Sequence, residues 1–242
     1  MRSASTLAPL RISGAGFTHK GLVRDRNEDA ILIDPNGELW AVADGMGGHG
    51  HGDVAADMVI DSLATLTRTD DPEVCLVETL QRSNQAVFAV ADGTVMGATV
   101  VAAFMDSNVA YCAWVGDSRI YLWRQGQLKQ MTKDHSHIQE LIDQGVLSKE
   151  AERSHPERNV VTRAIGAEPD VDVDTFVLPL QSADRLVLCS DGLNGAVEDT
   201  MLADTMMLNR PDNATAARLL QAALDAGAPD NVSVIVVTAT EG

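Results

Sequence analysis

The sequence lacks a long apolar segment and is poor in basic and aromatic residues. Lysine and arginine number 18 against 35 aspartates and glutamates, and aromatic residues make up 4% of the 242 residues. The net charge of −17 repels nucleic acid and anionic membrane surfaces. No apolar run approaches the roughly 18 residues that span a bilayer, and the N-terminus has no sustained apolar region typical of a secretory signal. We therefore expect a cytoplasmic protein with neither nucleic-acid nor membrane partners.

Cysteine is scarce, and several phosphate-handling motifs are missing. Cys75, Cys112 and Cys189 lie far apart, as expected for reduced, buried side chains. No arginine stands six residues after any of them, which excludes a cysteine phosphatase. There is no G-x-x-x-x-G-K-[ST] loop and no kinase set of glycine-rich loop, H-R-D and D-F-G. P-loop NTPases and protein kinases are therefore excluded as well.

Strand-like and helix-like segments are both present and are segregated along the chain. Apolar runs of strand length are rich in β-branched residues, and DPNG and RQGQ indicate hairpins between some of them. These runs cover residues 30–33, 39–43, 98–105, 109–115, 120–123, 175–178, 185–189 and 232–238. Helical periodicity covers residues 53–67, 72–91, 135–145, 198–208 and 213–226. The pattern predicts one α+β domain over residues 1–242, in which helices cover antiparallel sheets.

Four aspartates stand at the ends of apolar runs. Asp44 ends LWAVAD, Asp117 ends YCAWVGD, Asp191 ends RLVLCSD, and Asp230 opens DNVSVIVV. In antiparallel sheets the end of one strand lies beside the start of its neighbour, so all four can meet at one edge. A single Asp-Gly is typical of a turn, but carboxylates that crowd together raise one another's pKa. A hard divalent cation relieves this repulsion, which favours Mg²⁺ or Mn²⁺ over zinc.

Two stretches could complete such a site. VADGMGGHGHGD at 42–53 is compatible with a flexible turn, a phosphate cradle or half of a metal site. GLVRDRNED at 21–29 holds Arg24 and Arg26, which are either phosphate ligands or part of a solvated charge run. Two metal ions that share a carboxylate can activate a water, and a phosphoryl group is its natural electrophile. Metal-dependent phosphoester hydrolysis is therefore the predicted chemistry.

Eight motifs in order carry a family resemblance. They are RDRNED (24–29), DGMGGH (44–49), MGATVV (96–101), WVGDSR (114–119), TKDHS (132–136), NVVTRAIG (159–166), SDGL (190–193) and DN (230–231). With this set the chain resembles the PPM/PP2C family of metal-dependent serine/threonine protein phosphatases, in its bacterial stand-alone form. The resemblance implies a four-layer αββα sandwich, with two antiparallel sheets face to face and helices outside.

The resemblance also implies the metal ligands for two Mn²⁺ or Mg²⁺ ions, with a weaker third. Asp44 bridges two ions, and the Gly45 carbonyl joins the second. Asp191 and Asp230 hold the first, and Asp117 shares the third with Asp191.

Further roles follow from the same matched positions. Glu28 and Asp29 act through metal-bound waters, and Asn231 supports the ligands from behind. Arg24 is expected to bind the phosphate, whereas Arg26 does not match the phosphate-binding position of the family.

The implied reaction is in-line attack by metal-bound hydroxide without a phosphoenzyme. Eukaryotic members have a histidine two residues after the bridging aspartate, where this chain has Met46. His49 is then the candidate general acid or substrate contact, and a metal-bound water is the alternative. Residues 134–158 match the flap beside the active site of bacterial members, so we expect a flap subdomain at about 134–165.

The expected substrates are phosphoserine and phosphothreonine in proteins. The expected partner is a separate bacterial Ser/Thr kinase whose action the phosphatase opposes, with type VI secretion as one setting, and we expect a monomer. Two alternatives remain open: a catalytically dead binding module and a metallohydrolase of small phosphoesters. The retained carboxylates and Arg24 argue against the dead module.

Overall fold

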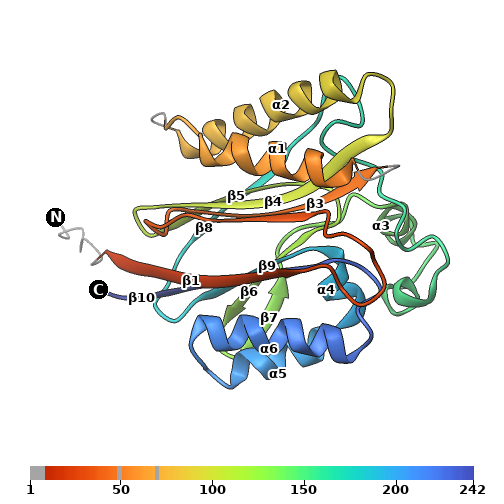
Figure 1. The fold of residues 1–242 in the computed structure, drawn as a ribbon. Helices are drawn as coiled ribbons and strands as arrows, with labels where there is room; N and C mark the ends of the chain where they lie inside the picture. Colours follow the sequence, from red (N-terminus) through yellow and green to blue (C-terminus); the bar gives the residue numbers. More distant parts are fainter. Residues whose placement is uncertain (1–8, 48–50, 69–70) are drawn as a thin grey trace.

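Two five-stranded sheets face each other and carry helices on their outer sides (Figure 1). The structure, a computed structural model, describes residues 9–47, 51–68 and 71–242. One sheet has the order β1–β10–β9–β6–β7, and the other has the order β2–β3–β4–β5–β8. All neighbouring strands are antiparallel. The predicted α+β, αββα sandwich is confirmed.

The strands of the first sheet are β1 (Leu10–His19), β10 (Val232–Glu241), β9 (Arg185–Cys189), β6 (Arg119–Arg124) and β7 (Gln127–Gln130). Those of the second sheet are β2 (Asp29–Ile33), β3 (Leu39–Gly47), β4 (Met96–Asp106), β5 (Val109–Val115) and β8 (Asp174–Pro179). The helices are α1 (Gly52–Ala64), α2 (Pro72–Ala91), α3 (His137–Asp143), α4 (Asp191–Ala196), α5 (Asp199–Met207) and α6 (Asp212–Asp225), with a 3₁₀ helix η1 (Lys149–Ser154).

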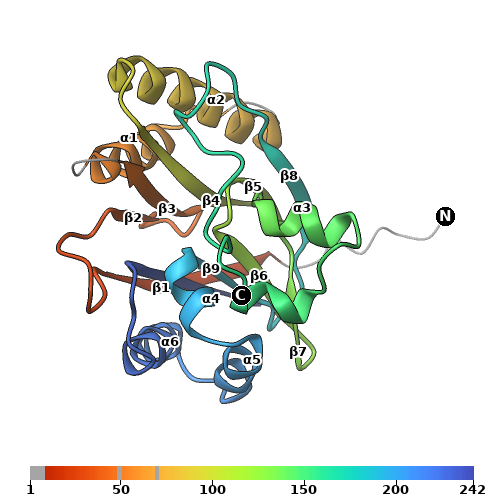
Figure 2. The same ribbon diagram turned by 90° about the vertical axis from the view of Figure 1, so that its right-hand side faces the viewer.

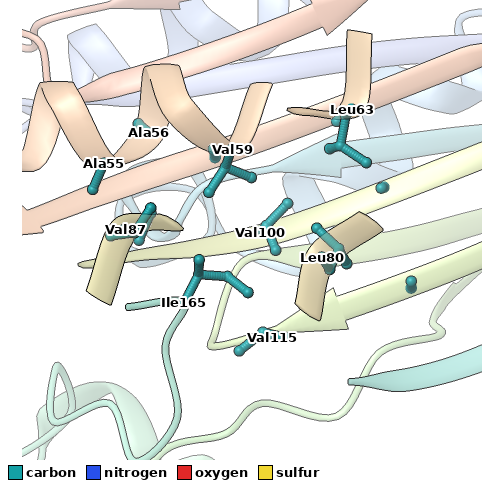
Figure 3. Close-up of a cluster of buried hydrophobic side chains, with 14 of the residues drawn as sticks. Ala55, Ala56, Val59, Leu63, Leu80, Val87, Val100, Val115 and Ile165 are labelled. Atoms are coloured by element: carbon teal, nitrogen blue, oxygen red, sulfur yellow. The ribbon is translucent and has the colours of Figure 1, made fainter. Parts of the chain in front are cut away.

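Three hydrophobic layers hold the sandwich together. The helices α1 and α2 pack on the outer face of the second sheet through residues such as Val59, Leu80 and Val100 (Figure 3). A central layer around Trp40 and Ile235 joins the two sheets. A third layer lies under α4, α5 and α6. Because β4 is covered on both faces, its residues 96–105 are all buried, and Thr99 is the one polar residue among them.

Four elements are not among the predicted ones: β1, β7, α4 and η1. The first was missed because Gly14 and Gly16 interrupt its apolar pattern. A Cβ on Gly14 would lie 2.8 Å from the ring of Trp40, so glycine lets the two sheets approach at this point.

The segment of residues 134–165 leaves the sandwich at one end, where it carries α3 and η1 (Figure 2). Its base is closed by a bridge between Ser136 and Val161 and by the bond from the Thr162 amide to the His135 carbonyl, 2.9 Å. The same end of the molecule holds the start of α4. Among the helices of the described residues, none combines the length and the apolar character that crossing a bilayer would need.

Candidate active site

Five aspartates meet at the end of the sandwich. Asp29 and Asp44 are direct cross-strand partners on β2 and β3. Asp117 follows β5, Asp191 is the first residue of α4, and Asp230 precedes β10. The strand expected at 39–43 does not stop before Asp44: β3 continues to Gly47, because residues 44–47 pair with β4. Asp44 is therefore fixed inside a ladder and not in a turn.

The aspartates raise one another's pKa. Burial is the main cause of the high pKa of Asp44, and its four neighbouring aspartates add to the effect. Asp117 behaves in the same way, through burial and the nearby charge of Asp191. Burial and Asp230 raise the pKa of Asp191 to about 6. Four desolvated carboxylates, with the partly exposed Asp230 beside them, repel one another when ionised, which is the condition that a bound cation relieves.

Asp29 is anchored by two hydroxyl groups, of which Ser190 lies in the SDGL motif and Ser233 lies in no motif. Ser190 Oγ and Ser233 Oγ donate to Asp29 Oδ2 over 2.8 and 2.7 Å. Burial nevertheless raises the pKa of Asp29 to about 7. Within the described residues its Oδ1 is buried and has no hydrogen-bond partner. A signal for Ser233 was available, because it is the one polar residue in the apolar run VSVIVV.

Arg24 lies at the same edge and is paired with one of these carboxylates. Its Nη2 donates to Asp230 Oδ2 over 2.8 Å, and this bond is the main cause of its raised pKa. More than half of the Arg24 side chain is exposed, so the guanidinium faces solvent at the rim of the acidic cluster.

Asn231 connects the loop of residues 20–28 to the start of β10. Its Nδ2 donates to the Lys20 and Arg26 carbonyls over 2.9 and 2.8 Å, and its Oδ1 accepts from the Glu28 amide over 2.8 Å. The residue is buried, and all three of these side-chain hydrogen bonds go to the loop. Asn231 therefore fixes the loop that bears Arg24 and Glu28.

Two glycines allow the backbones around the cluster to approach closely. A Cβ on Gly45 would lie 2.0 Å from the Gly52 carbonyl oxygen at the start of α1. A Cβ on Gly192 would lie 1.8 Å from the Asn231 carbonyl oxygen. Any larger residue would push apart the elements that carry Asp44, Asp191 and Asp230.

The donor set fits hard divalent cations. It consists of carboxylate oxygens, with one buried oxygen of Asp29 unpartnered among the described residues. The side chains are not yet gathered around one point: in the described parts of the chain, no three His, Cys, Asp or Glu residues form a ready-made ligand group. One of these carboxylates, Asp230, forms an ion pair with Arg24.

The structure brings together the predicted site residues that it describes. Arg24, Glu28, Asp29, Asn231 and the four strand-end aspartates lie at one edge. His49 lies outside the described residues. Arg26 contributes its backbone carbonyl to Asn231.

A cleft of about 450 Å³ opens beside the cluster. Asp117 and Asp191 line one part of it, and the rest is lined by Arg119 of β6, by residues of the segment 134–159 including η1, by α4 and by the start of α5. Sequence reasoning did not identify the cleft, because its walls come from segments distant in the chain. Its size is within the range of sites that hold small molecules.

Comparisons with known proteins agree with this geometry. A model of the family described as protein phosphatase 2C matches residues 14–229. A serine/threonine phosphatase stp of Listeria monocytogenes is 38% identical over 234 residues, which cover 91% of this chain and 93% of that protein. The structure of PppA, described as a key regulatory component of T6SS in Pseudomonas aeruginosa, has a TM-score of 0.87 and 36% identity, covering 96% of this chain and 99% of that one.

A further solved structure includes metal. The catalytic domain of the phosphatase PstP, in complex with two manganese ions, has a TM-score of 0.86 and 34% identity, and 96% of this chain and 99% of that chain are covered. The family match covers the sandwich except β10 and the first residues of β1, and it includes every aspartate of the cluster except Asp230, which lies one residue beyond it. This chain belongs to the protein phosphatase 2C family.

Proposed function

We propose that this chain is a metal-dependent phosphatase that hydrolyses phosphoserine and phosphothreonine in proteins. The observation that carries the proposal is the cluster of Asp29, Asp44, Asp117, Asp191 and Asp230, whose mutual repulsion needs a cation at neutral pH. The family match and the names of the relatives support the reaction type. The chain acts as one catalytic domain, with residues 134–165 as its flap.

The proposed ligands are Asp44 as the bridge between two Mn²⁺ or Mg²⁺ ions, with Gly45, Asp191 and Asp230 beside it and Asp117 for a third. Bound there, the ions supply an activated water and positive charge for the phosphate oxygens. The two manganese ions of the PstP structure support this number. Glu28 and Asp29 would contact the ions through bound waters. Asn231 fixes the loop that carries Glu28 through a hydrogen bond to the Glu28 amide.

Arg24 is the proposed phosphate ligand. Its exposed guanidinium lies at the rim of the cluster, and arginine can contact two phosphate oxygens at once. Its Nη2 donates to Asp230 Oδ2 over 2.8 Å, which places the guanidinium next to a proposed metal ligand. Proton delivery to the leaving serine or threonine oxygen is assigned to His49 or to a water, because the alkoxide is a poor leaving group without a proton.

The proposed biological partner is a separate Ser/Thr kinase. The relationship to PppA makes type VI secretion the first setting to test. The test of the function is hydrolysis of a phosphothreonine peptide with Mn²⁺ or Mg²⁺, with and without EDTA, and Asp44→Asn as the inactive control. Full activity in EDTA would overturn the metal proposal. A small aryl phosphate as the sole substrate would favour the small-phosphoester alternative, and no hydrolysis of either substrate would favour a binding module.

A further inference from the structure

Arg119 is the centre of a buried ionic network beside the cluster. It opens β6, two residues after Asp117, and its side chain is 10% exposed. Its Nη2 donates to Asp134 Oδ2 and to Glu152 Oε1, both over 2.6 Å. Asp134 begins the flap segment, and Glu152 belongs to η1, in the part of the segment that is far from its base. One arginine of the sandwich therefore binds the flap at two separated points.

The residue after Glu152 makes a second connection. Arg153 Nη2 donates to the carbonyls of Asn194 and Val197 over 2.7 and 2.6 Å. Both carbonyls lie at the C-terminal end of α4, where backbone oxygens lack partners within the helix. A cation at this end is also favoured by the helix dipole. Arg153 thus ties η1 to the helix whose first residue is Asp191.

The two contacts share a geometric consequence. Glu152 accepts a hydrogen bond from Arg119 on the strand that follows Asp117. Arg153 donates to the C-terminal end of the helix that begins with Asp191. Asp117 and Asp191 line the cleft of about 450 Å³, and the same two flap residues line it too. The far end of the flap thus forms a wall of the cleft, and this wall is held in place by two consecutive side chains.

The base of the flap does not depend on these contacts. The His135 amide donates to the Gly116 carbonyl over 2.9 Å, and the bridge between Ser136 and Val161 closes the segment. Loss of the contacts at η1 would therefore release the far end of the flap while its base remains attached.

We propose that Glu152 and Arg153 are positioning residues that hold η1 against β6 and α4, and so shape a cleft that binds the polypeptide flanking the phosphorylated residue. The cleft begins at Asp117 and Asp191, so a chain whose phosphate lies on the carboxylate cluster extends directly into it. This proposal rests on the proposed phosphatase function. A small phosphoester has no flanking chain and does not use the wall.

The test compares Glu152→Gln and Arg153→Gln with the wild type in saturating Mn²⁺. Loss of one charged hydrogen bond at a partly buried site should raise the KM for a phosphothreonine peptide about tenfold. The KM and kcat for p-nitrophenyl phosphate should stay within about twofold, the scale of surface substitutions. Backbone amides of residues 149–155 should exchange hydrogen at least about tenfold faster, since local opening controls exchange.

Matched controls are Glu157→Gln in the same segment and Arg218→Gln on α6. Glu157 pairs at the surface with His137, and Arg218 is exposed, so neither variant should change peptide KM or exchange. Arg153→Lys keeps the positive charge at the end of α4 and should restore part of the peptide KM, which also guards against misfolding of the glutamine variant.

Two results would overturn the proposal. One is unchanged exchange in residues 149–155 of both glutamine variants. The other is an equal loss on the peptide and on p-nitrophenyl phosphate, which would place the effect in the reaction centre and not in the cleft. If the wild type hydrolyses neither substrate, the proposed function fails. Fluorescence anisotropy of a labelled phosphothreonine peptide then tests whether the cleft binds peptide. Equal binding by the wild type and the glutamine variants refutes the role of Glu152 and Arg153.

Discussion

Arg24 and Asp230 form an ion pair in which Nη2 of the arginine lies 2.8 Å from Oδ2 of the aspartate. The proposed phosphate ligand and a proposed metal ligand are thus each other's partners. A cation that takes Asp230 would free the guanidinium of Arg24 for the phosphate. In the proposed site, metal binding at Asp230 and phosphate binding at Arg24 are therefore coupled through this hydrogen bond.

Replacement of Arg24 by alanine should weaken substrate binding more than stability. We expect Arg24→Ala to raise the KM of a phosphothreonine peptide by about tenfold or more, the effect of losing a charged hydrogen bond. Its exposed ion pair should contribute less than about 1 kcal/mol to the free energy of unfolding. Steady-state kinetics and thermal melts measure both, with Arg26→Ala from the same loop as control. An unchanged KM would place the phosphate contact elsewhere.

Neutralising an aspartate of the cluster should lower activity without lowering the stability of the fold. Asp191→Asn is expected to lower kcat at least about 10²-fold, the scale of removing a principal electrostatic group. In EDTA the variant should melt at or above the wild-type temperature, because the substitution removes one of several repelling charges. Asp204→Asn, exposed on α5, should change neither quantity. A variant with normal turnover would refute the assignment of Asp191.

The metal-free protein should lose stability as the pH rises from about 4 to about 7. The pKa of Asp29 is raised to about 7 and that of Asp191 to about 6, above the value of about 3.9 in an unfolded chain. In this window the folded state binds more protons than the unfolded state, so the free energy of unfolding falls with increasing pH. Thermal melts in EDTA across this range should show the decline, and Mn²⁺ should reverse it at neutral pH. A melting temperature that rises from pH 5 to 7 in EDTA would contradict the charge crowding.

Two glycines of α4 should respond in opposite ways to alanine. A methyl group on Gly192 would meet the Asn231 carbonyl at 1.8 Å, so Gly192→Ala should destabilise by about 1–3 kcal/mol. Around a Cβ on Gly195 the described residues place no atom within 4 Å, so Gly195→Ala should be neutral or stabilise by up to about 1 kcal/mol. Urea unfolding of both variants measures the difference. Equal stability of the two would show that α4 can move away from β10 without loss.

The acidic edge illustrates what sequence patterns can predict. Apolar runs that end in Asp44, Asp117 and Asp191 are local features, and antiparallel pairing requires such ends to lie near the start of a neighbouring strand. The prediction of a shared edge therefore needed no tertiary information. The length of β3 beyond Asp44 was not predictable in this way, because glycines contribute no apolar signal and pair only when β4 is present.

The surroundings of the carboxylates were less accessible to sequence reasoning. Ser233 supports Asp29 from a position 204 residues away, and Arg24 reaches Asp230 across 206 residues. Glu152 and Arg153 had no pattern that distinguished them from other surface charges of the segment 134–158.

By itself the sequence determined an α+β domain with helices over antiparallel sheets, the acidic edge and the arginine loop, because periodicity, charge and turn residues act on near neighbours. The four-layer αββα order was implied by the family resemblance. Tertiary structure alone decided which side chains contact one another: the ion pair of Arg24 with Asp230, the hydrogen bonds from two serines to Asp29, and the contacts of η1 with β6 and α4. The reason is physical, since hydrogen bonds and ion pairs depend on distances of a few ångströms that only the packed sheets and helices set.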